Sequence, residues 1–367
     1  MQSIYVQRRN ELLKNLAKRG IEKVIVGKPL NIYYFTGIMI NPYERFVALL
    51  LDVKNNSCLM ILPNLEKEIA SIKGIPEILH RDDEDPVLKL QEVLAECKIL
   101  GLETDYFSMK LGEKFRLGLP EMELIDISRV IENCRLYKGQ EEIEAIRQAA
   151  EYGDQSLAEV KDLIKVGCSE KEIQFALLQA MSKKTGVNTD MFVVQVLGGA
   201  RTANPHGYSG DYIFQNGDAV AIDYGVYYGR YWSDYCRTFF IGEPDPKLKE
   251  IYHIVLEAQT TAINLIHPGI PIREIDLAAR KIIEKAGYGE FFIHRLGHGI
   301  GLDIHEYPKI HQQNGDLIEE GMVFTIEPGI YIPQLGGVRI EDDVVVTMTG
   351  AKVLNKYPKD YESMILK

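Results

Sequence analysis

The feature that most constrains this chain is a pair of carboxylates on two adjacent predicted strands. The run from Asp218 to Asp223 is apolar and typical of a buried strand, yet it ends on an acid. The next run, Tyr231 to Ile241, is aromatic and β-branched, has Asp234 in its interior, and follows a glycine-containing turn, which predicts a hairpin. Aspartate is uncommon in strands, and a buried charge is costly unless it is neutralised. We therefore expect a cation between the two side chains.

The same arrangement occurs a second time, about a hundred residues further along the chain. A glycine, an apolar strand, an acid and another glycine recur from Gly321 to Gly329, where Glu327 is the acid, and Glu341 follows at a second predicted strand. The helix before each hairpin is repeated as well, since residues 163–186 match a segment that begins at Leu265. A helix-plus-hairpin unit is thus duplicated, and four carboxylates should meet where the two copies join. Two divalent cations would balance their charge.

The composition is typical of a soluble acidic enzyme or scaffold. With 367 residues, 46% of them hydrophobic, the chain is long enough for two domains. A formal net charge of −11 argues against a general nucleic-acid-binding surface. No apolar run is long enough to span a membrane, the N-terminus lacks the apolar core of a secretory signal, and the five cysteines are scattered. We therefore expect a cytoplasmic location, with neither a nucleic-acid nor a membrane partner.

Helix and strand signals alternate in the first third of the chain. Amphipathic patterns at 6–19 and 86–97 flank short apolar strand candidates, which predicts a small α/β domain over residues 1–125. Residues 126–137 should form a connecting helix, because no stretch rich in proline, glycine or serine separates the halves. The duplicated unit occupies the remainder, residues 138–367, so we expect an α+β protein.

A segment rich in histidine and glycine lies between the second repeated helix and the second hairpin. Glycines alternate with other residues around His298, which allows the backbone to approach a neighbour closely. One imidazole and four carboxylates make five protein ligands, a suitable set for two ions. His294 and His305 flank His298, and His206 precedes the first acidic strand. A phosphate-binding loop is excluded, because the segment lacks the required lysine and the strand-to-helix context.

These motifs together resemble the pita-bread metallopeptidases, which include prolidases, Xaa-Pro aminopeptidases and methionine aminopeptidases. The matching segments, all after about Arg135, are Pro205-His206, Ile222–Gly225, Ser233-Asp234, Gly297–Gly301, His305–Pro308, Thr325–Gly329 and Gly337–Asp342. Tyr34–Gly37 is similar to the N-terminal domain of creatinase and prolidase, so the resemblance covers the whole chain. It implies a pita-bread catalytic domain, built on the duplicated helix–hairpin unit, after a smaller creatinase/prolidase-type α/β domain.

The resemblance also implies a dinuclear metal hydrolase. Its metal ligands would be Asp223, Asp234, His298, Glu327 and Glu341. A single imidazole among the ligands favours Mn²⁺ or Co²⁺, although Zn²⁺ would also fit. Glu327 would accept a proton from the attacking water, His206 and His305 would donate hydrogen bonds to the substrate, Arg339 would orient ligand carboxylates, and His294 and Tyr331 would line a proline pocket.

The chain departs from the family at Cys236, where a threonine is usual. This residue should share a strand face with Asp234. A thiol is a poor hydrogen-bond partner for a carboxylate, so the support of the ligands and the metal affinity are expected to change.

Three functions remain open at this point. The short chain and compact N-terminal domain favour a homodimeric Xaa-Pro dipeptidase (prolidase), which cuts dipeptides with proline second. Its candidate lid is the loop Asn41–Arg45, whose other interpretation is an ordinary surface turn. A Xaa-Pro aminopeptidase, which acts on longer peptides, is the main alternative. A non-catalytic binding protein on the same fold is disfavoured because all five ligands are present. Neither the native metal nor the preferred first residue of the substrate is predicted.

Overall fold

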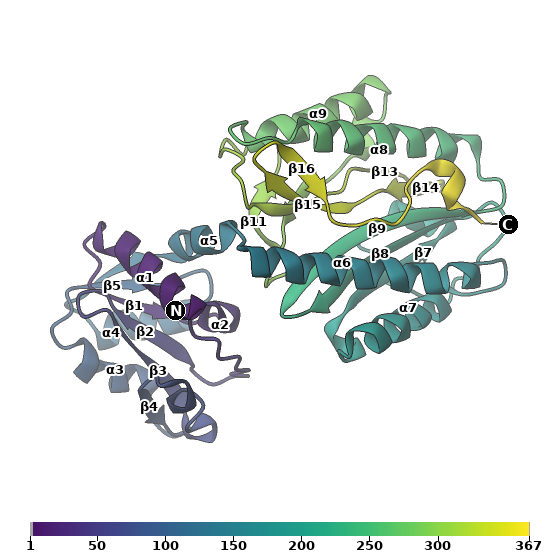
Figure 1. Cartoon of the computed structure of the whole chain (residues 1–367). Helices are drawn as coiled ribbons and strands as arrows, with labels where there is room; N and C mark the ends of the chain where they lie inside the picture. The colour runs from purple at the N-terminus through teal and green to yellow at the C-terminus, as the bar shows by residue number, and fades with distance from the viewer. Residues whose placement is uncertain (1–2, 367) are drawn as a thin grey trace. The chain divides into compact units, whose positions relative to one another are not determined.

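The computed structural model describes residues 3–366, and the chain divides into two compact units, Met1–Arg135 and Leu136–Lys367 (Figure 1). The division falls inside α5 (Ser128–Leu136), the helix expected between the halves. The domain limits drawn from the sequence, residues 125 and 137, remain a prediction. No helix among residues 3–366 combines the length and the apolar character needed to cross a membrane.

The N-terminal unit is a six-stranded mixed sheet with helices. Its strands lie in the order β4-β3-β2-β1-β5-β6, with β2 antiparallel to both neighbours and the other pairs parallel. The strands are β1 (Lys23–Val26), β2 (Ala48–Asp52), β3 (Ser57–Pro63), β4 (Glu77–His80), β5 (Ile99–Leu102) and β6 (Glu123–Asp126). The helices before α5 are α1 (Ile4–Ala17), α2 (Pro29–Thr36), α3 (Pro86–Leu94) and α4 (Met109–Gly118). The helices predicted at 6–19 and 86–97 correspond to α1 and α3.

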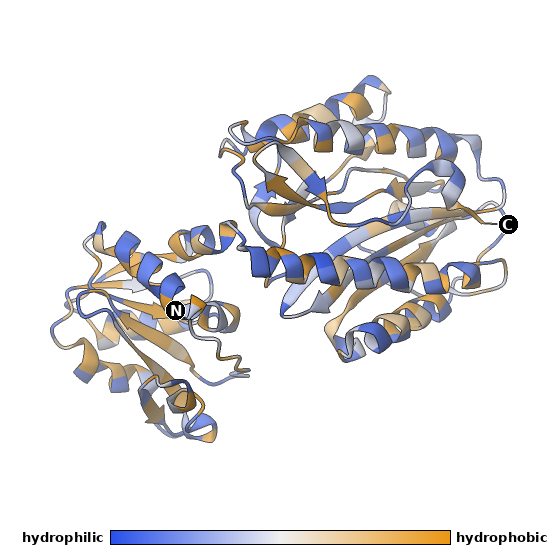
Figure 2. Ribbon diagram, in the orientation of Figure 1, coloured by the Kyte–Doolittle hydropathy of each residue, from blue (hydrophilic) through white to orange (hydrophobic). Residues whose placement is uncertain are grey.

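The C-terminal unit holds its strands between two pairs of helices (Figure 1). The helices are α6 (Gln140–Val160), α7 (Glu170–Thr185), α8 (Pro246–Leu265) and α9 (Ile272–Lys285). One sheet has the order β17-β9-β8-β7, with β7 (Val193–Gly198), β8 (Ala219–Tyr228), β9 (Tyr231–Ile241) and β17 (Ile365–Leu366). Helices α6 and α7 pack on this sheet. Apolar side chains of the strands and of the helix sides that face them form one core (Figure 2).

The second repeat forms a five-stranded sheet in the order β11-β10-β12-β15-β16. Its strands are β10 (Gly297–Gly299), β11 (Glu306–Ile310), β12 (Val323–Ile326), β15 (Asp342–Thr347) and β16 (Gly350–Val353). A separate two-stranded ribbon consists of β13 (Gly329–Ile332) and β14 (Gly336–Arg339). Helices α8 and α9 pack against strands of this half.

The two acidic hairpins are less alike than their sequences indicate. Strand β8 continues past Asp223 to Tyr228, because the aromatic residues at its end pair across β9, as Tyr227 does with Trp232. In the second copy β12 ends before Glu327, since the following Pro328 has no N–H to donate to a ladder. The β13–β14 ribbon is inserted there, and β12 pairs with β15 rather than with the next strand in the chain.

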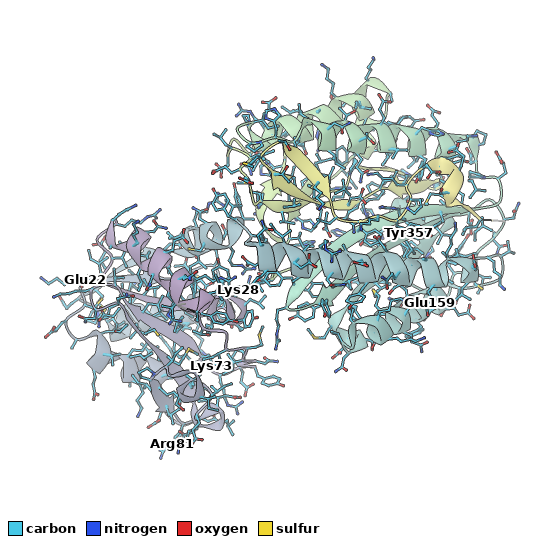
Figure 3. All side chains as sticks on the ribbon, viewed as in Figure 1. Glu22, Lys28, Lys73, Arg81, Glu159 and Tyr357 are labelled. Atoms are coloured by element: carbon cyan, nitrogen blue, oxygen red, sulfur yellow. The ribbon has the colours of Figure 1, made fainter. Side chains whose placement is uncertain are left out.

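A buried ion pair joins the two repeats. Arg237 of β9 is 1% exposed and its Nη2 lies 2.7 Å from Asp342 Oδ1 at the start of β15. The same guanidinium donates to the carbonyls of Glu341, Tyr357 and Pro358 (Figure 3, where Tyr357 is labelled). Because a buried charge is tolerated only when it is paired and hydrogen-bonded, this network fixes Glu341 beside β9.

Candidate metal centre

The five predicted metal ligands meet in the C-terminal unit. They come from different strands or strand ends: Asp223 from β8, Asp234 from β9, His298 from β10, Glu327 from the end of β12 and Glu341 from the start of β15. Their ligand atoms form overlapping groups in which all atoms lie within 4.8 Å of one another, namely Asp223, Asp234 and Glu341; His298, Glu327 and Glu341; and Asp234, His298 and His305. In the last group, a ring nitrogen of His305, which is predicted to contact the substrate, lies within 4.8 Å of the ligand atoms of Asp234 and His298.

Strand register explains why the two aspartates point the same way. Asp223 is directly opposite Cys236, and Gly225 is directly opposite Asp234. Because residues two apart on a strand share a face, both aspartates project from one side of the β8–β9 ladder as diagonal neighbours. The predicted hairpin geometry is therefore present, and Cys236 lies on the same face as Asp234.

His298 is oriented by backbone contacts. Its Nδ1 lies 3.1 Å from the Gly299 carbonyl oxygen, which leaves Nε2 turned toward the carboxylates, 3.5 Å from Glu327 Oε1 and 3.8 Å from Asp234 Oδ2. A proton held on Nδ1 by a carbonyl exposes the Nε2 lone pair, which is how histidine binds metals in proteins. The backbone N–H of His298 also donates to Thr325 Oγ1 at 3.1 Å.

The glycines beside His298 allow neighbouring backbone to pass very close. A Cβ atom at Gly297 would lie 2.0 Å from the Thr325 carbonyl oxygen, and one at Gly299 would lie 2.3 Å from the Tyr307 carbonyl oxygen. Any side chain at either position would push β10 away from its neighbours. The close approach expected from the sequence is therefore to adjacent backbone.

The electrostatics of the cluster favour a cation. Burial, followed by repulsion from neighbouring carboxylates, raises the pKa of Asp234 and of Glu341 well above the ordinary range. Burial also raises the pKa of Glu327 to about 8, although Arg339 acts in the opposite direction. Burial and the nearby His305 lower the pKa of His298 to about 3, so this imidazole is neutral. Crowded carboxylates beside a neutral imidazole are the donor set that a divalent ion requires.

The cluster lies at the bottom of a cleft of about 830 Å³. Besides the five ligands, its lining includes every other predicted site residue except Tyr331, the motif residue Pro205, and residues that the sequence analysis did not single out: Val193, Gln195, Ile293, Arg295 and Ile304. His206 is on the exposed turn that follows the short helix Gly199–Ala203. The ring of His305 is 4.0 Å from that of His298, centroid to centroid.

Arg339 connects one ligand to the wall of the cleft. Its guanidinium forms an ion pair with Asp223 and donates to the Tyr331 hydroxyl at 2.8 Å. Tyr331 is only 5% exposed, and its hydroxyl lies 2.9 Å from His294 Nε2. The structure thus places Tyr331 behind His294, where it supports the imidazole.

Two cleft residues missed in the sequence have recognisable signals. Gln195 interrupts the apolar run Val193–Leu197, and strand pairing puts it directly opposite Asp223. Arg295 follows His294 inside the glycine-rich motif. Asp343, the second residue of β15, is fully buried, accepts a hydrogen bond from Ser233 Oγ at 2.7 Å, and burial raises its pKa to about 8.

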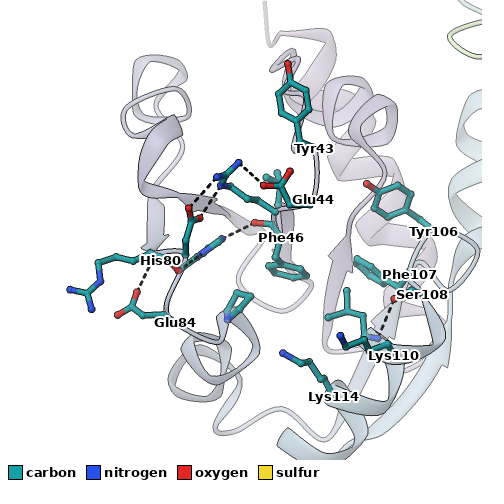
Figure 4. A pocket seen from close by; sticks show the side chains of 16 residues that line it. Tyr43, Glu44, Phe46, His80, Glu84, Tyr106, Phe107, Ser108, Lys110 and Lys114 are labelled. Carbon is teal, nitrogen blue, oxygen red and sulfur yellow. Dashed lines mark hydrogen bonds and ion pairs between the residues drawn. The ribbon is translucent and has the colours of Figure 1, made fainter.

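The proposed lid loop lines a different hollow, of about 700 Å³, within the N-terminal unit (Figure 4). Arg45, the last residue of the loop, forms an ion pair with Asp82 at 2.8 Å. Tyr43, at the tip of the loop, is 79% exposed. The phenyl rings of Phe46 and Phe107 stack in the wall.

Known proteins share both the sequence pattern and the fold. The family model for metallopeptidase family M24 matches residues 144–348, and the model for the creatinase/prolidase N-terminal domain matches residues 8–137. The Xaa-Pro dipeptidase of Pyrococcus furiosus is 39% identical over 356 residues, which cover 96% of this chain and 99% of that protein.

Solved structures agree over nearly the whole chain. A recombinant prolidase from Thermococcus sibiricus superposes with a TM-score of 0.92 at 34% identity, with complete coverage of both chains. An X-Pro aminopeptidase from Thermotoga maritima gives 0.86 at 31% identity and covers 98% of this chain and 99% of its own.

These matches confirm the fold class that the family resemblance implies, a creatinase/prolidase-type domain followed by a pita-bread domain. They also confirm that the protein is a metallopeptidase, an enzyme class that requires divalent metal ions, and the carboxylate and imidazole cluster offers a site for them. With its M24 domain and its near full-length relatives, the chain belongs to metallopeptidase family M24.

Proposed function

We propose that this protein is a Xaa-Pro dipeptidase, which uses two divalent ions to hydrolyse the bond between the first residue and proline in a dipeptide. The observation that carries the proposal is the convergence of four carboxylates and one imidazole at the bottom of a single cleft. The full-length similarity to proteins named Xaa-Pro dipeptidase or prolidase supports the substrate class.

The proposed ligand roles are those that the resemblance to the family implies. Asp234 and Glu341 would contribute to holding both ions, Asp223 would contribute to one of them, and His298 with Glu327 to the other. Mn²⁺ or Co²⁺ suits this oxygen-rich set best. When bound, the ions activate a water molecule and polarise the scissile carbonyl. Arg339 holds the Asp223 carboxylate in place through their ion pair.

Glu327 is the proposed general base. Its carboxylate lines the cleft, with Oε1 3.5 Å from His298 Nε2, and from there it can accept a proton from a water molecule held among the ligands. Thr325 Oγ1, 3.5 Å from Glu327 Oε1, helps to orient the group.

His206 and His305 are proposed to donate hydrogen bonds to the substrate and to the developing oxyanion. Both line the cleft, and preorganised donors of this kind lower the barrier most effectively where charge appears in the transition state. His294, supported by Tyr331, is proposed to form one wall of the proline pocket. Burial lowers the pKa of His294 to about 4, so it presents a neutral ring.

We also propose a cytoplasmic homodimer with the loop Asn41–Arg45 as the lid. The exposed Tyr43 at the loop tip is available for such a contact. The alternative function, a Xaa-Pro aminopeptidase, is supported by the Thermotoga maritima structure, which is almost as similar as the prolidases. A non-catalytic role is disfavoured because all five ligands converge.

Substitution of Glu341 by glutamine should separate metal binding from fold. We expect Glu341→Gln to lose bound Mn²⁺ and activity. In metal-free protein it should raise the Tm above that of metal-free wild type, because glutamine is neutral without taking up a proton, whereas the raised pKa of Glu341 makes its burial among other acids costly near neutral pH. Metal analysis and thermal unfolding with and without Mn²⁺ measure both effects. The control is Glu320→Gln, which changes an exposed carboxylate. Wild-type metal content in Glu341→Gln would contradict the ligand assignment.

Removal of either cleft histidine should reduce chemistry without removing metal. We expect His206→Ala and His305→Ala to keep their bound ions and to lose roughly 10²- to 10³-fold in kcat/KM, the effect of one transition-state donor. His267→Ala, at an exposed position, should behave as wild type. If either cleft variant loses metal, its residue is a ligand or supports one, and the donor role is wrong.

Substrate length distinguishes the two peptidase activities. With Mn²⁺, Co²⁺ and Zn²⁺ in parallel, we expect a higher kcat/KM for Xaa-Pro dipeptides than for matched Xaa-Pro-Xaa tripeptides. Faster cleavage of the tripeptides would establish the aminopeptidase instead.

A further inference from the structure

A row of three side chains crosses the strands under the cleft. In register, Gln195 of β7 lies opposite Asp223 of β8, which lies opposite Cys236 of β9. Directly opposite residues on antiparallel strands share a face, so all three project toward the metal cluster. The metal ligand Asp223 therefore has an amide on one side and a thiol on the other.

Arg339 lies across this row. Its guanidinium forms an ion pair with Asp223, stands beside the Cys236 thiol, and places Nη2 3.4 Å from Gln195 Oε1. Arginine can only donate hydrogen bonds, so the contact assigns the amide oxygen of Gln195 to the arginine side.

The other end of the Gln195 amide reaches the turn that carries His206. Gln195 Nε2 donates to the carbonyl oxygen of Gly207, the residue that follows His206. A carbonyl can only accept a hydrogen bond, so the contact with Gly207 requires a donor at the end of the Gln195 side chain. The contact with Arg339 requires an acceptor on the same side chain. Only a side-chain amide satisfies both neighbours; a carboxylate or a thioether of the same length satisfies at most one.

The remainder of the His206 loop is held at its ends and just beyond Gly207, where the Tyr208 carbonyl accepts from Arg201 at 2.7 Å and Ser209 Oγ accepts from the Val196 N–H at 2.8 Å. The buried carboxylate of Glu170 accepts hydrogen bonds from the Gly198 N–H at 2.8 Å and the Gly210 N–H at 2.7 Å. His206 lies between these points on exposed backbone, with its N–H 3.3 Å from Asn204 Oδ1. Gln195 contacts the residue next to His206 and, through Arg339, links it to the metal ligand Asp223.

We propose that Gln195 is a positioning residue for catalysis: it couples the Arg339–Asp223 pair to the His206 turn and so fixes the His206 imidazole relative to the metal ligands. The proposal rests on the donor role assigned to His206 above. Displacement of a catalytic group by about 1 Å can cost as much as 10²-fold in rate, so loss of this contact should reduce kcat/KM by roughly 10- to 10²-fold.

A double-mutant cycle between Gln195 and His206 tests the proposal in the full-length, Mn²⁺-loaded protein. Gln195→Met keeps the length of the side chain and removes both hydrogen bonds. We expect it to lower kcat/KM roughly 10- to 10²-fold while metal content and Tm stay at wild-type values. In the His206→Ala background the same change should have almost no further effect, because the group that Gln195 positions is absent.

Gln174 of α7 provides a matched control, because its hydrogen bond reaches the same strand as Gln195. Gln174 Nε2 donates, at 2.8 Å, to the carbonyl oxygen of Val194, which is the residue next to Gln195. Gln174 itself does not line the cleft. Gln174→Met therefore removes a similar hydrogen bond and should leave kcat/KM unchanged. A second variant, Gln195→Glu, keeps an acceptor for Arg339 but cannot donate to Gly207, and should reproduce the loss seen with methionine.

The outcomes separate this inference from the proposed function. If Gln195→Met lowers kcat/KM by the same factor in the wild-type and His206→Ala backgrounds, Gln195 acts independently of His206. That result would overturn this inference and leave the proposed function standing. Loss of metal in Gln195→Met, or full activity in Gln195→Glu, would overturn it as well. A His206→Ala variant with wild-type kcat/KM would refute the donor role of His206, and the positioning role would fail with it.

Discussion

The constraint that shapes the whole catalytic unit is the mutual repulsion of the carboxylates buried at the junction of its two repeats. Asp234 and Glu341 are each almost completely buried, and burial together with repulsion from neighbouring carboxylates raises the pKa of both. Such a cluster opposes folding unless protons or cations neutralise it. The surrounding structure therefore has to hold the acids in place by other means, and the metal ions supply the remaining stabilisation when they bind.

The supporting interactions are found around the cluster, in both repeats. Arg237 binds Asp342 and the Glu341 carbonyl, which locks the start of β15 against β9. Asp343 accepts from the backbone N–H of Asp234 at 3.1 Å, which fixes that ligand from behind. The glycines on either side of His298 allow β10 to lie close to the neighbouring backbone, so that the His298 imidazole lies beside the carboxylates. Each ligand is thus placed by a strand or strand end whose position is set by contacts outside the metal site, as a preorganised centre requires.

Much of this site could be predicted from residue patterns, because its chemistry repeats along the chain. Acids in apolar strands are rare enough to indicate the metal cluster, and the family motifs supplied His298. The parts that could not be predicted depend on register and on long-range contacts. Gln195 has no motif of its own, and its role is visible only once β7 is paired with β8. The β13–β14 ribbon, which lies in the chain between the paired strands β12 and β15, is likewise evident only in the folded chain.

The most direct measurement is an anomalous difference map from crystals of the wild-type protein grown with Mn²⁺. The account predicts two peaks per chain, about 3.5–4 Å apart, with Asp234 and Glu341 within bonding distance of both. One peak alone, or peaks that lie away from the five carboxylate and imidazole ligands, would contradict it.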